Sequence, residues 1–222
     1  MGYGIRVMVS GPRACFTRPE MKSERVSYDV ITPSAARGIL EAVYWKPAIC
    51  WHIDRIKVLN EIVFDTFRRN ELEGKLSYQM ARAACERDED CYVEASMTRQ
   101  QRATTYLRNV SYVIDAHFSI TDRAGSDDTS EKHYNIALRR LRRGQSFAQP
   151  VLGCREFAAA VELLEDGESP RSFYEDVPEK DLGFMLFDLD FSDSEHPQPR
   201  FYRAVMRNGS IDVAAARKGV VG

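Results

Sequence analysis

The stretch VSYVIDAHFSI, residues 110–120, is the clearest strand pattern in the 222-residue chain. Every second position, from Val110 to Ile120, carries an apolar or aromatic side chain, so one face of the stretch is apolar. A period of two is typical of a β-strand with one face on a hydrophobic core. We therefore take this strand as the centre of a sheet and place the other elements around it.

Two helices are predicted, one before and one after this strand. Thr32 and Pro33 indicate the start of a helix over 33–45, because the hydroxyl caps free amides and a proline at the first position loses no hydrogen bond. Ser130 is the expected cap of a helix over 131–143, which ends at Gly144. The core-facing positions of this second helix are Tyr134, Ala137, Leu138 and Leu141.

The strands complete the order of elements. They are expected at residues 3–9, at 49–64 with an extension, at 102–107 and 110–120 as a hairpin turning at Arg108-Asn109, and near 154–163. The order strand, helix, strand, strand, helix, strand describes a ferredoxin-like (RRM-like) α+β fold. We assign residues 1–164 to this domain, with an insertion near 66–101 where the pattern is polar and weak.

The C-terminal region differs in kind. Apolar residues alternate from Met185 to Phe191, and Asn208-Gly209 is a strong two-residue hairpin signal. Residues 165–222 are therefore predicted to form a smaller, mainly antiparallel β domain.

Composition describes an ordinary globular protein with 44% hydrophobic and 29% charged residues. There is no run of about 18 apolar residues and no signal-peptide pattern, so we expect a cytoplasmic protein without a membrane partner. The five cysteines are odd in number and scattered, and the four histidines lack ligand spacing. No disulfide, metal or other cofactor is expected.

Charge is distributed unevenly although the formal net charge is only -2. Five Arg and one Lys stand against one Glu between residues 131 and 155, whereas the segment 162–195 is strongly acidic. A basic island in a near-neutral protein indicates a docked polyanion. The alternative is a solvated helix face beside an incidental histidine.

Tyr44 closes the first helix, in the sequence Tyr44-Trp45-Lys46-Pro47, and Lys132-His133 opens the second. Aromatic residues before a proline commonly plug a helix end, which is the plain structural interpretation of Tyr44. Both helices of a ferredoxin-like fold pack on one face of the sheet, so Tyr44 is expected to approach Lys132 and His133.

The three side chains suit metal-free RNA cleavage by attack of the ribose 2′-hydroxyl. That reaction needs a base, an acid for the leaving 5′-oxygen and a cation for the charged phosphorane. Histidine serves as base or acid, tyrosine as donor or orienting group, and lysine as the cation at a helix N-terminus. Which of Tyr44 and His133 is the base stays open.

Several motifs, in order, resemble the CRISPR-associated RAMP superfamily, in particular the d-type branch of the "Cas-five" proteins of subtype I-C. The motifs are ILEAVYWKPAI (39–49), RQQR (99–102), TYLRNV (105–110), AHF (116–118), KHY (132–134) and LGCRE (152–156). The stretch 66–101 is mostly outside them, and the glycine-rich loops of many RAMP proteins are sparse here.

The resemblance implies a metal-independent endoribonuclease that cuts the CRISPR repeat RNA hairpin and leaves 5′-hydroxyl and 2′,3′-cyclic phosphate ends. It implies retention on the 5′ handle of the mature guide RNA inside Cascade, beside its backbone and large subunits. Tyr44, Lys132 and His133 carry over as the catalytic set. The expected RNA contacts are Lys46, Arg102, Arg108, Arg139, Arg140, Arg142, Arg143, Gly153 and Arg155.

Two other functions remain open from the sequence. A non-catalytic scaffold that caps guide RNA in Cascade would use the arginines equally well but would leave Lys132-His133 idle. A general nucleic-acid module would bind duplex DNA without preference for a hairpin. His117 lies on the polar face of its strand and is expected to be structural.

Overall fold

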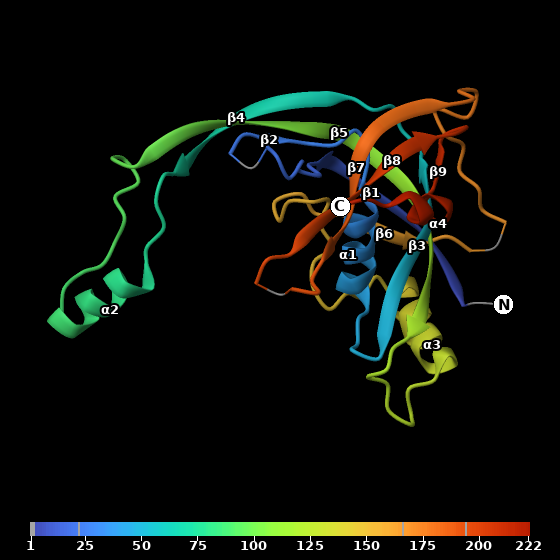
Figure 1. Ribbon diagram of the computed structural model, residues 1–222, viewed down its shortest axis with the longest axis horizontal. Coiled ribbons are helices and arrows are strands. Elements are labelled where there is room, and N and C mark those ends of the chain that lie inside the picture. The colour runs from blue at the N-terminus through green and yellow to red at the C-terminus, as the bar shows by residue number, and fades with distance from the viewer. Residues whose placement is uncertain (1–2, 22, 166, 194) are drawn as a thin grey trace.

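A central antiparallel sheet and two helices make up the body of the protein, which has a mixed α/β fold (Figure 1). The structure is a computed structural model that describes residues 3–21, 23–165, 167–193 and 195–222. The chain order is β1 (Gly4–Ala14), α1 (Pro33–Val43), β3 (Ile49–Val58), β5 (Arg99–Ile120), α3 (Ser130–Arg142) and β6 (Ala160–Leu163). The four strands lie in the sheet in the order β6-β1-β5-β3, each antiparallel to its neighbour. A short β2 (Arg25–Val26) pairs in parallel with β5.

Helix α1 forms where the sequence predicts it. The Thr32 hydroxyl accepts a hydrogen bond from the Ala35 amide at 3.2 Å, and Pro33 occupies the first turn. Its buried face carries Ala36, Ile39, Leu40 and Val43. The helix ends at Val43 rather than at residue 45, because Tyr44 is already extended.

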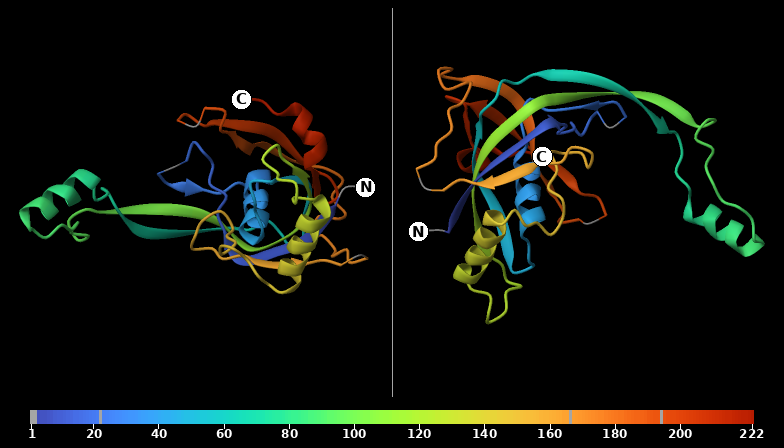
Figure 2. Two further views of the ribbon diagram at one scale, coloured as in Figure 1. Left: turned by 90° about the horizontal axis from the view of Figure 1, so that it is seen from below. Right: turned by 180° about the vertical axis from the view of Figure 1, so that it is seen from behind.

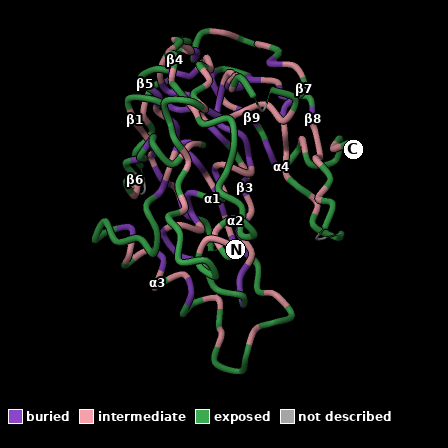
Figure 3. The backbone as a smooth tube through the Cα atoms, turned by 90° about the vertical axis from the view of Figure 1, so that its left-hand side faces the viewer, coloured by how far each residue is buried: buried purple, intermediate pink, exposed green. Residues whose placement is uncertain are grey.

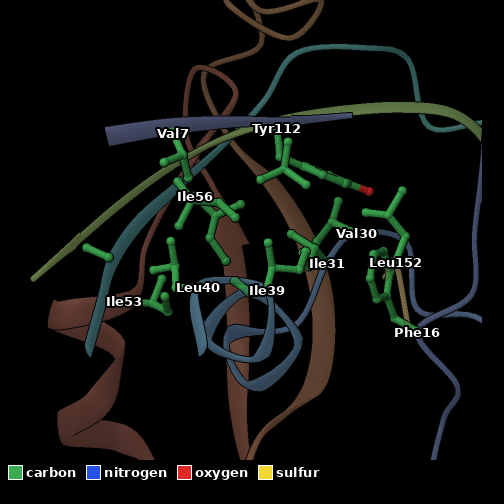
Figure 4. Close-up of a cluster of buried hydrophobic side chains, with 14 of the residues drawn as sticks. Val7, Phe16, Val30, Ile31, Ile39, Leu40, Ile53, Ile56, Tyr112 and Leu152 are labelled. Atoms are coloured by element: carbon green, nitrogen blue, oxygen red, sulfur yellow. The ribbon is translucent and has the colours of Figure 1, made fainter. Parts of the chain in front are cut away.

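The core lies between α1 and the sheet. Figure 4 shows Ile39 and Leu40 of α1 against Val7, Ile53 and Ile56 of the sheet. All five side chains are at most 3% exposed. This packing fixes the end of α1 relative to the sheet, and with it Tyr44.

Helix α3 also forms as predicted, with one correction. Thr129, not Ser130, is the cap, since the Thr129 hydroxyl accepts the Lys132 amide at 3.2 Å. Gly144 follows with a φ of 60°, the left-handed conformation expected after a helix. Ala137 and Leu141 are buried as predicted, while Tyr134 and Leu138 are half-buried.

The predicted hairpin at Arg108-Asn109 is wrong. Asn109 has a φ of 51°, but the chain continues, and residues 99–120 form one strand. The strand is paired with β1 both before and after Asn109, with Arg108 opposite Arg13 and Val110 opposite Gly11. Asparagine tolerates the left-handed conformation in a strand as well as in a turn. The dipeptide therefore marks a local irregularity and no reversal.

The true reversal lies in the segment predicted as an insertion. Strand β4 (Phe64–Leu72) pairs with the first half of β5, and α2 (Tyr78–Arg87) lies between them at the tip. Figures 1 and 2 show that these elements project from the body as a long arm. No residue of α2 is buried. Figure 3 shows the buried residues, in purple, gathered in the body. Large apolar side chains on the tip are exposed: Leu76, Tyr78, Met80, Tyr92 and Met97.

The C-terminal region contains β7 (Lys180–Asp190) and β8 (Gln198–Met206), which pair as a two-stranded antiparallel sheet. Asn208 and Gly209 have φ values of 48° and 76°, which confirms the predicted turn. Strand β9 (Ser210–Asp212) then pairs with β3 of the central sheet, and α4 (Val213–Ala216) and a 3-10 turn (Arg217–Gly219) follow. In the described residues, no helix has the length and apolar character needed to cross a membrane.

The last strand of the sheet is shorter than predicted. Residues 154–158 turn back on themselves, with the Phe157 amide bonded to the Cys154 carbonyl and the Leu152 amide bonded to the Phe157 carbonyl. Only 160–163 pair with β1.

Candidate active site

Tyr44 is held at the end of α1 by groups on two other elements, β3 and α3. Its backbone carbonyl accepts a hydrogen bond from the Trp51 indole of β3 at 2.8 Å. The Arg140 guanidinium of α3 lies 5.1 Å from the Tyr44 ring centroid and donates to the Val43 carbonyl at 2.7 Å. The phenol is therefore fixed in direction, and the residue is only 2% exposed.

His133, in the first turn of α3, meets Tyr44 directly. The Tyr44 hydroxyl lies 2.7 Å from His133 Nδ1. The His133 ring stands edge-on to Phe118, and the residue is 1% exposed. The sequence predicted that Tyr44 would approach this histidine, and the fold brings the two together from positions 89 residues apart.

The Tyr44 hydroxyl stays protonated around neutral pH. Burial raises the pKa of the Tyr44 phenol, and the positive charge of Arg140 opposes this shift only in part. The hydrogen bond with Nδ1 is therefore one between a neutral phenol and an imidazole. It occupies Nδ1 and leaves Nε2 as the nitrogen of His133 that can exchange a proton with a substrate.

Lys132 lies beside the pair and is linked to it through a carboxylate. Its ammonium contacts the Asp127 carbonyl at 3.1 Å and Asp128 Oδ1 at 3.3 Å. Asp128 Oδ1 is also 3.2 Å from His133 Nε2. The Lys132 side chain is 46% exposed, so it is the member of the predicted set that solvent and ligands reach.

Asp128 is a site residue that sequence reasoning missed. Its Oδ2 accepts the Gly125 amide at 3.0 Å, and this bond, followed by Lys132 and then His133, lowers the pKa of the carboxyl. The available signal was its position four residues before Lys132, the spacing at which opposite charges meet near a helix start.

The three arginines of α3 and Arg143, which directly follows it, divide into two kinds. Arg140 packs on Tyr44, and Arg142 pairs with Glu165 at 3.0 Å. Arg139 and Arg143 are exposed. The arginine track predicted from the sequence is therefore partly engaged within the protein.

The remaining predicted RNA contacts differ in their exposure. Lys46, Arg108 and Arg155 are exposed. Arg102 is half-buried, with its Nε 3.7 Å from Glu71 at the base of the arm. Gly153 has a φ of 86°, and a side chain there would lie 2.0 Å from the Cys15 carbonyl oxygen. The close approach expected of Gly153 is thus to the protein's own backbone.

Other histidines lie away from this site. His117 bonds to Asp54 at 2.8 Å on the polar face of the sheet, and its ring is 5.1 Å from that of His52. Within the described parts of the chain, no three His, Cys, Asp or Glu side chains are arranged to hold a metal ion.

The arrangement brings together a group that can transfer protons and a cation, which are among the groups that cleavage by a 2′-hydroxyl needs. His133 offers a proton-transferring nitrogen, Tyr44 orients it, and Lys132 offers a positive charge. Lys132 also lies in the first turn of α3, where backbone amides favour an anion.

Comparisons with known proteins identify the family of the chain. The chain is 50% identical over 218 residues to the CRISPR pre-crRNA endoribonuclease Cas5d of Mannheimia succiniciproducens, covering 96% of each chain. It is 36% identical over 230 residues to the protein of the same name from Thermus thermophilus, covering 96% of this chain and 92% of that one. A solved structure described as a CRISPR-associated protein superposes with a TM-score of 0.72 at 28% identity, covering 99% of this chain and 96% of the other.

The sequence profile of a family of CRISPR-associated proteins (Cas_Cas5), the Cas5d family, matches residues 4–214. That range contains every predicted catalytic residue and the whole arm. The chain therefore belongs to the Cas5d family of CRISPR-associated proteins.

Proposed function

We propose that the protein is a metal-independent endoribonuclease that cuts CRISPR repeat RNA and keeps the 5′ handle of the guide within Cascade. Both relatives compared above are named CRISPR pre-crRNA endoribonucleases. The observation that carries the proposal is the Tyr44 hydroxyl 2.7 Å from His133 Nδ1, with Lys132 next to the histidine at the start of α3.

Each residue of the set has a distinct role in the proposed reaction. Tyr44 holds the imidazole by Nδ1, and His133 Nε2 takes the proton of the attacking 2′-hydroxyl and delivers a proton to the leaving 5′-oxygen. Lys132 balances the negative charge that grows on the phosphorane. The products are a 5′-hydroxyl and a 2′,3′-cyclic phosphate, and acid–base catalysis by a positioned group is worth roughly 10² to 10⁴ in rate.

The proposed fold is ferredoxin-like. The order β6-β1-β5-β3, with α1 and α3 contributing to one core, supports this topology. We further propose the division into residues 1–164, which bind and cut RNA, and residues 165–222, a small β domain whose strand β9 extends the central sheet.

The RNA and its partners are proposed to occupy surfaces that the body and the arm provide. Exposed Lys46, Arg108, Arg139, Arg143 and Arg155 would contact phosphates. The arm carries apolar side chains that the described residues leave exposed, which supports contact with the backbone or large subunit of Cascade. All five cysteines are free thiols, in keeping with the cytoplasm.

A cleavage assay in EDTA tests the proposal. The protein is incubated with a repeat hairpin, and the products are mapped at single-nucleotide resolution. We expect one cut with a cyclic phosphate end, and a 2′-deoxy nucleotide immediately 5′ of the cut abolishes it. Cleavage that depends on added divalent metal, or that survives the 2′-deoxy substitution, contradicts the mechanism.

The second candidate function is a non-catalytic guide-RNA scaffold. The burial of Tyr44 and His133, at 2% and 1% exposed, favours it, because RNA does not reach these groups in this conformation. His133→Ala separates the two functions: we expect lost cleavage with retained RNA binding. His117→Ala, on the polar face of the sheet, is the matched control and keeps both. Competition by unrelated RNA and duplex DNA detects a general nucleic-acid module.

A further inference from the structure

His133 Nε2 is a buried polar atom without a hydrogen-bond partner in the described structure. The His133 side chain is 2% exposed, and its Nδ1 is already bonded to Tyr44. The atom that faces Nε2 is Asp128 Oδ1, at 3.2 Å but without hydrogen-bond alignment. An unpartnered ring nitrogen directed at the start of a 13-residue helix indicates a site for an anion.

The carboxylate of Asp128 makes the contacts that a phosphate in this site would make. Oδ1 lies 3.3 Å from the Lys132 ammonium and 3.2 Å from His133 Nε2. Oδ2 accepts the Gly125 amide at 3.0 Å. An ammonium, an imidazole nitrogen and a backbone amide around two oxygens of one anion are the groups that bind a phosphodiester.

A scissile phosphate and this carboxylate exclude each other. In the proposed reaction the phosphate contacts Lys132, and its leaving oxygen takes a proton from His133 Nε2. Asp128 Oδ1 now stands within 3.3 Å of both atoms. A second anion at this place would suffer like-charge repulsion as well as overlap.

We propose that the Asp128 carboxylate occupies the position of the scissile phosphate and that bound RNA displaces it. This inference rests on the proposed function and adds the Gly125 amide to the phosphate site. Thr121 is bonded to Pro47 and Ala48, and Thr129 caps α3. Between them, the backbone-to-backbone hydrogen bonds of residues 122–128 are local, from Ala124 to Thr121 and from Asp128 to Gly125, so this loop can move without unpacking the core.

Displacement makes Asp128 a specificity-determining residue. The phosphate of an RNA reaches this position only if RNA contacts elsewhere on the protein compensate for the lost contacts of Asp128 with Lys132 and Gly125. A repeat hairpin held by the basic surface meets this condition, and a weakly held RNA does not. The carboxylate therefore increases the binding free energy that an RNA must supply before it can be cleaved, which disfavours RNAs other than the repeat.

Asp128→Asn tests the displacement, with Asp127→Asn as the matched control. The amide keeps the acceptor for Gly125 and removes the charge beside Lys132. Among the described residues, the neighbouring Asp127 side chain accepts a hydrogen bond from the Ser126 hydroxyl, at 3.5 Å. We measure the affinity for 2′-deoxy repeat RNA, and single-turnover cleavage of the repeat hairpin and of a scrambled hairpin.

We expect Asp128→Asn to bind the 2′-deoxy repeat about fivefold more tightly, because RNA then no longer has to break the charge pair of Asp128 with Lys132, and such a pair near 4 Å is worth about 1 kcal/mol in water. Cleavage of the scrambled hairpin rises relative to that of the repeat, and Asp127→Asn changes neither quantity by as much. Asp128→Ala, which also removes the Gly125 bond, gives the same direction.

Two results overturn the inference. One is equal affinity in the Asp128 and Asp127 variants. The other is loss of repeat cleavage in Asp128→Asn with unchanged discrimination, which would make Asp128 a positioning residue for His133. Failure of the wild type to cut RNA bears on the proposed function instead, and the affinity measurement still tests the displacement.

Discussion

Replacing Gly153 by alanine tests the tightest backbone contact near the LGCRE motif. Gly153 has a φ of 86°, and an added Cβ would lie 2.0 Å from the Cys15 carbonyl oxygen and 2.7 Å from its carbon. Because both are backbone atoms, they cannot rotate away. Gly144, with a φ of 60° and no atom within 4 Å of an added Cβ, is the matched control.

The magnitude follows from the two geometries. Both variants place an L-residue in the left-handed conformation, which destabilises the folded state by about 1–2 kcal/mol. Gly153→Ala must also push residues 152–154 from Cys15, which breaks the 3.0 Å bond from the Cys15 amide to the Leu152 carbonyl, worth about 1 kcal/mol. Overpacking adds about 1–3 kcal/mol. We expect a loss of about 3–6 kcal/mol for Gly153→Ala and about 1–2 kcal/mol for Gly144→Ala.

Urea unfolding followed by circular dichroism measures both losses. The midpoints are converted to free energies with each variant's own slope, and thermal unfolding provides a check at about 2–4 °C per kcal/mol for a chain of this size. If the two alanine variants are equally stable, the close approach of Gly153 to Cys15 is refuted.

Three further predictions concern the site and its surroundings. Tyr44→Phe leaves buried Nδ1 of His133 unpaired, so we expect a loss of about 1–3 kcal/mol in unfolding free energy and of roughly 10² to 10⁴ in single-turnover cleavage. Arg140→Ala lowers both stability and cleavage, because this guanidinium packs on the phenol, whereas exposed Arg143→Ala weakens RNA binding alone and reduces its salt slope by about 1. A hydrogen bond from the Cys15 thiol lowers the pKa of the Cys154 thiol to about 6. We therefore expect the alkylation rate of Cys154, followed by mass spectrometry of digests, to be half-maximal near pH 6.

Local signals predicted the two helices and the meeting of their ends. Thr32-Pro33 and Gly144 mark helix boundaries by backbone chemistry that needs no tertiary contact. Once the order of elements indicated one sheet with both helices on it, the approach of Tyr44 to His133 followed from topology. The 2.7 Å contact confirms that step.

Features set by long-range packing were not predictable in the same way. Asn109 tolerates the left-handed conformation, and the sequence alone does not show whether the chain then turns or continues; pairing with β1 decides that it continues. The arm has no buried helix face to produce a periodic signal. Arg140 has the sequence pattern of a solvated residue, and its place on Tyr44 depends on the crossing of α1 and α3.

Strand β5 is one continuous strand with the arm at one end and the candidate site near the other. Its 22 residues, at about 3.3 Å each, measure about 70 Å. Its last residue, Ile120, leads directly into the segment that carries Asp128. A subunit that binds the tip of the arm would therefore contact the same strand that leads, at its other end, to the Asp128 carboxylate beside Lys132 and His133.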